Sequence, residues 1–122
     1  MATAADVMKG GFSAGQAKAL NGQTNLTVSA AGTTSATATT LTASNNLITT
    51  CGSGAGVILP AAEINDEIWV WNGTGTNTLS VYPDSGSTIN QLAADVPGNV
   101  PPYGGAIFRK VSKTAWWVNL SA

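Results

Sequence analysis

Side chains able to carry out chemistry are few in this sequence of 122 residues. There is no histidine, which removes the most common general base and the most common metal ligand. The single cysteine, Cys51, has no partner for an intrachain disulfide or a cysteine-based zinc site. We expect it to be a buried apolar thiol. The residue types therefore predict a protein that is not an enzyme and that uses no cofactor.

Two short patterns are typical of binding sites, but neither has the required context. Glu63, Asp66 and Glu67 form the only acidic cluster, and their spacing matches no known calcium loop. We expect a solvated turn there, with a cation site as the alternative. The glycine-rich stretch 52–56 precedes a predicted strand, whereas a phosphate cradle needs the N-terminus of a following helix. No catalytic, cofactor-binding or metal-binding residue is therefore predicted.

The aromatic side chains are more informative, because they lie in predicted strands. Ile68 and Val70 should face the core, whereas Trp69 and Trp71, at the alternate positions of the same strand, should share the opposite face. The adjacent Trp116 and Trp117 must point to opposite faces of their sheet, so one can be core and the other exposed. Exposed tryptophans mark protein interfaces or sugar-stacking platforms; the alternative is that all of them fill the core. The candidate interface residues are Trp69, Trp71, Tyr82, Trp116 and Trp117.

The charge content bears on the partners of the chain. Charged residues make up 9% of it, against about 25% in an ordinary soluble domain, and the net charge is −1. With five Lys and Arg and no basic run, no nucleic-acid partner is expected. No apolar stretch is long enough to span a membrane or to serve as a signal peptide. A surface so poor in charge does little to keep copies apart, which favours an assembly subunit over a monomer with a neutral polar surface.

The strand pattern predicts the fold class. Residues 1–24 have little apolar surface, and we expect a flexible N-terminal arm that becomes ordered only when it docks. Residues 25–122 should form one β domain of about eight short strands, which is an antiparallel β-sandwich or small barrel rather than a parallel sheet. Three hairpins are expected, at 46–59, 67–82 and 106–120. The threonine-rich stretch 34–42 is either an exposed strand or a linker. Residues 61–65 can form one turn of helix, and 95–105 is expected to be a loop.

A series of motifs between residues 57 and 120 resembles a known β module. In chain order they are VILPAA at 57–62, the turn Asn65-Asp66, IWVWNG at 68–73, NTLSVYP at 77–83, Gly86, Ile89-Asn90, GAIF at 105–108 and Trp116-Trp117. This order resembles small virion proteins of tailed bacteriophages, among them head-decoration and fibre proteins. The resemblance covers about half of the chain. It implies a β-sandwich or barrel, usually a homotrimer, without enzymatic activity, and it carries over no site residues.

The expected function follows from the resemblance and the composition together. We expect a capsid decoration (cement) protein that binds major capsid protein on the assembled phage head and stabilises the shell. Such a protein would be made in the host cytoplasm and reside on the capsid surface of the virion. The alternative is a receptor- or carbohydrate-binding module of a phage tail fibre or spike. A sugar-cleaving enzyme is disfavoured by the missing histidines and the lack of paired acidic residues.

Overall fold

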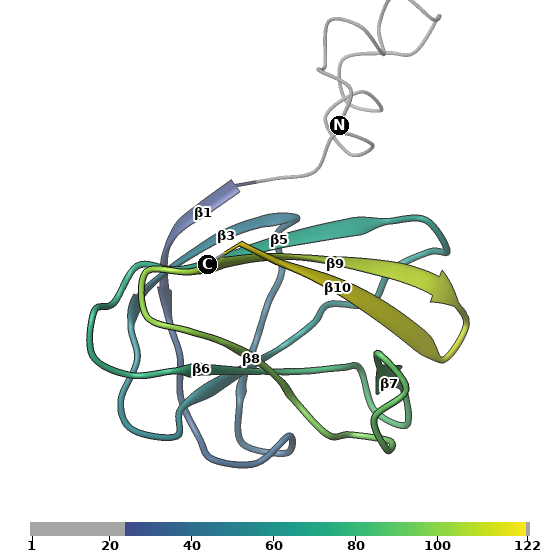
Figure 1. Cartoon of the computed structure of the whole chain (residues 1–122), viewed down its shortest axis with the longest axis horizontal. Helices are drawn as coiled ribbons and strands as arrows, with labels where there is room; N and C mark the ends of the chain where they lie inside the picture. The colour runs from purple at the N-terminus through teal and green to yellow at the C-terminus, as the bar shows by residue number, and fades with distance from the viewer. Residues whose placement is uncertain (1–23, 122) are drawn as a thin grey trace, which may run out of the picture.

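The computed structural model describes residues 24–121, apart from the side chains of Leu120 and Ser121. These residues form ten β-strands in two layers, with no helix among them (Figure 1). The predicted all-β class is confirmed. Of the predicted arm, only Thr24 is described, where it begins the first strand; residues 1–23 lie outside the described part of the chain.

The strands belong to a six-stranded and a four-stranded sheet. In chain order they are β1 (Thr24–Ser29), β2 (Thr39–Thr40), β3 (Asn45–Thr50), β4 (Gly56–Ile58), β5 (Glu67–Asn72), β6 (Leu79–Tyr82), β7 (Thr88–Ile89), β8 (Gly98–Val100), β9 (Gly105–Ser112) and β10 (Ala115–Ser121). The larger sheet has the order β1-β3-β5-β9-β10-β7, and the smaller one the order β2-β4-β6-β8.

The first six strands alternate between the two sheets, and each of β1 to β4 pairs in parallel with the strand one turn later. Three turns of chain therefore stack as rungs, in a β-solenoid-like arrangement. Thr24 pairs with Asn45, 21 positions later, and Asn45 pairs with Trp69, 24 positions later. This corrects the expected antiparallel sandwich or barrel. It also corrects the hairpins predicted at 46–59 and 67–82, whose strands lie in different sheets, whereas the β9–β10 hairpin is confirmed.

The corner between β5 and β6 explains why a hairpin was the wrong expectation. The buried Asn72 donates from Nδ2 to the backbone oxygens of Asn77 (2.9 Å) and Val100 (3.3 Å). Its Oδ1 accepts from the backbone N–H (3.1 Å) and the hydroxyl (2.6 Å) of Thr74. Asn77 in turn donates to the backbone oxygen of Cys51 in the preceding rung (2.9 Å). Glycine- and asparagine-rich turns close hairpins as well as corners, so the long-range partners decide between them.

Three connecting segments also differ from the expectation. The threonine-rich stretch is mostly a turn, closed by a 2.9 Å bond between the hydroxyls of Thr34 and Thr37, and only Thr39–Thr40 is extended. The loop expected at 95–105 contains β8. The helical turn that 61–65 was able to form is absent, because Asp66 instead accepts a bond from the backbone N–H of Glu63 (2.9 Å).

The core lies between the two sheets and follows the two-residue alternation of the strands. As predicted, Ile68 and Val70 point into it from β5, between outward-facing Trp69 and Trp71. The largest completely buried side chains come from both sheets: Trp116, Phe108, Ile48, Leu59, Leu79, Ile89, Val57, Val70, Val81 and Val100.

Replacing Val70 or Ile68 by alanine is expected to lower the free energy of unfolding by about 2–4 kcal/mol, because burial is lost and a cavity remains. Chemical denaturation followed by tryptophan fluorescence measures this. Glu63→Gln and Asp66→Asn, at exposed positions, should change it by less than about 1 kcal/mol with or without calcium. A calcium-dependent rise in melting temperature would contradict our interpretation of the acidic cluster.

Candidate functional site

The outer side of the six-stranded sheet carries an unusual set of exposed side chains. On β3, β5, β9 and β10, the residues that alternate with the core positions point away from the core. We call the following group of them the aromatic face: Leu47, Glu67, Trp69, Trp71, Ile107, Arg109 and Trp117.

Strand register places these residues in rows across the sheet. Leu47, Trp71 and Gly105 form one row, and Glu67, Arg109 and Trp117 form another. Between them, Trp69 lies opposite Ile107. The rings of Trp69 and Trp71 are 5.5 Å apart, centroid to centroid, at an angle of 34°. Such tilted pairs are favourable aromatic contacts, so the two indoles stabilise one another on the surface.

Glycine backbone supports two exposed aromatic rings, Trp71 of this face and Tyr103 in the segment before β9. A Cβ on Gly105 would lie 2.8 Å from Nε1 of Trp71, so the indole can take its position only because residue 105 has no side chain. In the same way, a Cβ on Gly75 would overlap the ring of Tyr103. Trp71 is 40% exposed and Tyr103 is 79% exposed. Both rings therefore rest on backbone and present apolar surface to solvent.

The structure divides the five predicted interface candidates into two groups. Trp71 and Trp117 are exposed (40% and 46%), and Trp69 is half-buried beside Trp71. Trp116 is completely buried, which confirms that it and Trp117 face opposite ways. Tyr82 is also buried, and its hydroxyl donates to the backbone oxygen of Thr33 (3.0 Å). We therefore remove Trp116 and Tyr82 from the candidate surface, because both side chains are buried.

Trp116 is held in the core by polar partners as well as by packing. Its Nε1 donates to Oδ1 of Asp84 (2.7 Å). Nζ of the buried Lys110 lies 5.6 Å from the ring centroid and 3.8 Å from Oδ2 of Asp84. An indole N–H and an ammonium both need partners when they are buried, and one carboxylate supplies both. These three groups have a structural role.

Sequence reasoning missed Tyr103, Leu47 and Ile107 as surface residues. Tyr103 lies in the proline- and glycine-rich stretch before β9, where its φ is 57° and its N–H donates to the backbone oxygen of Thr74 (3.0 Å). An aromatic residue between turn residues has no strand alternation to carry it into a core, and that signal was present in the sequence. Leu47 and Ile107 gave no such signal, because each is followed by another large apolar residue, Ile48 or Phe108, and alternation does not say which of the two faces the core.

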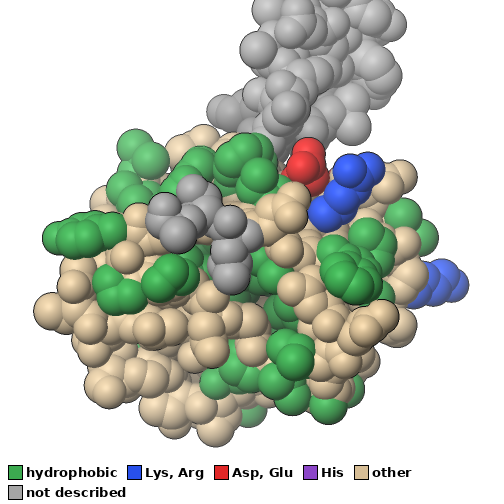
Figure 2. Space-filling model, in the orientation of Figure 1, with side chains coloured by type: hydrophobic (Ala, Val, Ile, Leu, Met, Phe, Trp, Pro, Cys, Tyr) green, Lys and Arg blue, Asp and Glu red, His purple; other side chains and the backbone are tan. Residues whose placement is uncertain are grey.

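The aromatic face offers contact surface rather than reactive groups. Its only charged members, Glu67 and Arg109, lie directly opposite each other on neighbouring strands. In the view of Figure 2, hydrophobic and uncharged side chains cover most of the described surface, and charged ones gather toward one side. Cys51 is buried, and desolvation raises the pKa of its thiol, so the reactive thiolate is disfavoured. Within residues 24–119, no three Cys, Asp or Glu side chains converge as metal ligands.

Two further findings concern membrane-spanning helices and the comparison with known proteins. No helix in the described part of the chain is long and apolar enough to cross a membrane. Comparison with protein-family models, curated proteins and solved structures finds no match.

Proposed function

We propose that this chain is a decoration protein of a tailed-phage head, and that it binds the assembled shell of major capsid protein through the aromatic face. The observation that carries the proposal is a rigid sheet whose outer side exposes two tryptophans among aliphatic neighbours, with a single pair of opposite charges. The centres of protein interfaces are enriched in aromatic side chains and depleted in charged ones. The resemblance of residues 57–120 to small virion proteins of tailed phages is the reason for proposing major capsid protein as the partner.

The mechanism is thermodynamic linkage. A ligand that binds only the assembled shell stabilises that state by an amount that grows with its free concentration. No chemical step is needed, which agrees with a chain that has no histidine and whose one thiol is buried. Large flat aromatic side chains give contact area at a low entropic cost, since each has only two rotatable bonds. A surface of this kind suits a repeating capsid lattice.

We expect the free protein to be a homotrimer at micromolar concentration. The low charge places little repulsion between copies, and three linked copies would bind a lattice at high effective concentration. Multi-angle light scattering tests this. A mass near that of a single 12.3 kDa chain would contradict it.

Phage heads that lack this protein are expected to assemble normally but to rupture at a lower temperature or a milder osmotic shock than complete heads. Adding the purified protein back should restore their stability and saturate at a fixed number of copies per head. DNA release during a temperature ramp is the measurement. If saturating protein leaves the rupture temperature unchanged, the decoration proposal is wrong.

One observation favours a second candidate, a carbohydrate- or receptor-binding module of a tail fibre. Trp71 and Tyr103 lie near the same end of the six-stranded sheet, and each rests over a glycine with its ring exposed. Flat, exposed rings held in this way are suited to stacking on sugar rings. Binding of the purified chain to a glycan array or to host cells, together with no effect on heads, would favour this candidate over the first.

A further inference from the structure

The three-rung stack is open at the end where β1 and β2 lie. Both are edge strands of their sheets: β1 pairs only with β3, and β2 only with β4, among the described residues. The backbone groups on the other side of each strand are therefore available for pairing. Natural edge strands are usually protected by charge or proline, yet residues 24–59 contain neither. An unprotected edge of this kind calls for a further strand in each sheet.

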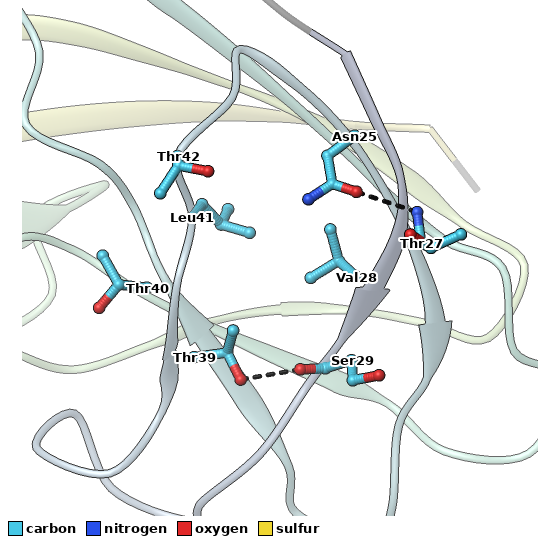
Figure 3. A pocket seen from close by; sticks show the side chains of 8 residues that line it. All are labelled: Asn25, Thr27, Val28, Ser29, Thr39, Thr40, Leu41 and Thr42. Carbon is cyan, nitrogen blue, oxygen red and sulfur yellow. Dashed lines mark hydrogen bonds between the residues drawn. The ribbon is translucent and has the colours of Figure 1, made fainter.

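A groove of about 250 Å³ lies between these two edge strands. Figure 3 shows Val28 of β1 and Leu41, next to β2, pointing toward one another across it. Threonine and serine side chains line its walls, and the hydroxyl of Thr39 donates to the backbone oxygen of Ser29 (2.8 Å), which joins the two sides. The groove is thus the end of the core, and no charged side chain lines it.

The 21 residues before β1 repeat the pattern of the first rung. Thr24 pairs with Asn45, 21 positions later, whereas the offset is 20 positions at Val28–Ile48 and 18 positions between β2 and β4. Residues 3–23, compared at the offset of 21 positions with 24–44, are identical at five positions. Three of these five are positions that the fold constrains. Val7 corresponds to buried Val28, Leu20 to buried Leu41, and Gly11 to Gly32, which has a φ of 73° and no room for a Cβ.

We propose that residues 3–23 form a further rung, which stacks on β1 and β2 and closes the groove with Val7 and Leu20. The length of the segment and its direct continuity with Thr24 allow it to add one strand to each sheet. At the same offset, Asp6 and Lys18 correspond to exposed Thr27 and half-buried Thr39, whereas Lys9 corresponds to Ala30, which is buried. Charged side chains on an edge strand block pairing with further chains, which is a protection that β1 and β2 lack. The proposal differs from the sequence-based expectation of a flexible arm that becomes ordered only when it docks.

Hydrogen exchange of the amides of Thr24–Ser29 in the full-length protein tests the proposal, because those pointing away from β3 gain acceptors only if a strand docks there. The matched variants are Val7→Lys and Met8→Lys: position 7 corresponds to buried Val28, and position 8 to exposed Ser29. We expect Val7→Lys to speed exchange in β1 by about tenfold or more, and Met8→Lys to leave it unchanged. Leu20→Lys and Asn21→Lys form a second pair, with the same expected contrast.

Several results would contradict the proposal that residues 3–23 form a further rung. One is that both variants of a pair change exchange in β1 equally, or that neither changes it. Another is that the wild-type amides of β1 exchange as fast as those of an unstructured peptide. If protection instead rises with protein concentration and is insensitive to Val7→Lys, a second copy covers this end. Unchanged tryptophan fluorescence of each variant shows that the described domain, which contains all four tryptophans, is still folded. No capsid enters the experiment, so its failure leaves the proposed function untouched.

Discussion

Trp116→Ala is expected to lower the free energy of unfolding by about 4–5 kcal/mol, near the upper end for core aromatic residues. The side chain is completely buried, and its removal leaves a large cavity between the sheets. It also removes the N–H donor of the 2.7 Å bond to Asp84 and the ring that lies beside Lys110. Because native proteins are stable by only about 5–15 kcal/mol, this loss is a large fraction of the total stability.

The neighbouring residue provides the control for this prediction. Trp117→Ala removes the same side chain one position later, but from the exposed side of the sheet. It should change the free energy of unfolding by less than about 1 kcal/mol. Urea denaturation monitored by far-UV circular dichroism compares the two. Similar losses of stability in both variants would mean that the assignment of one tryptophan to the core and the other to the surface is wrong.

Trp71→Ala is expected to weaken binding to phage heads by about 30-fold or more, the effect of losing one interface hot spot. Trp71 lies in the middle strand of the aromatic face, between Leu47 and Gly105, in contact with Trp69. Its removal takes away exposed aromatic surface and the support of the neighbouring indole. Co-sedimentation of labelled protein with undecorated heads, over a range of concentrations, gives the affinity.

Leu92→Ala is the matched control for the binding experiment. Leu92 has a similar exposure, 43%, but lies in the loop that follows β7, outside both sheets. Its replacement should leave head binding within about twofold of wild type, as expected for a residue outside the interface. If Leu92→Ala weakens binding while Trp71→Ala does not, the protein still binds heads but not through the aromatic face. If neither variant has an effect, a different surface must be sought.

Turn chemistry was the main source of error in predicting this fold. The stretch 73–78 has the composition of a hairpin loop, but Asn72 and Asn77 bond to Val100 and Cys51, which are distant in sequence. Those bonds carry the chain from one sheet to the other. A local rule cannot anticipate them, because it considers only the residues that form the turn.

The sequence by itself determined the directions of side chains along each strand. A period of two sends Ile68 and Val70 inward and Trp69 and Trp71 outward, and it separates Trp116 from Trp117, because successive side chains of a strand must alternate. Only the tertiary structure decided which strands pair, which rows of side chains form the aromatic face, and that Tyr82 is buried. Pairing depends on backbone hydrogen bonds between residues about 18–24 positions apart in the rungs. Alternation is the same whether a strand's neighbour is parallel or antiparallel, so the alternation in the sequence does not indicate which of the two pairings forms.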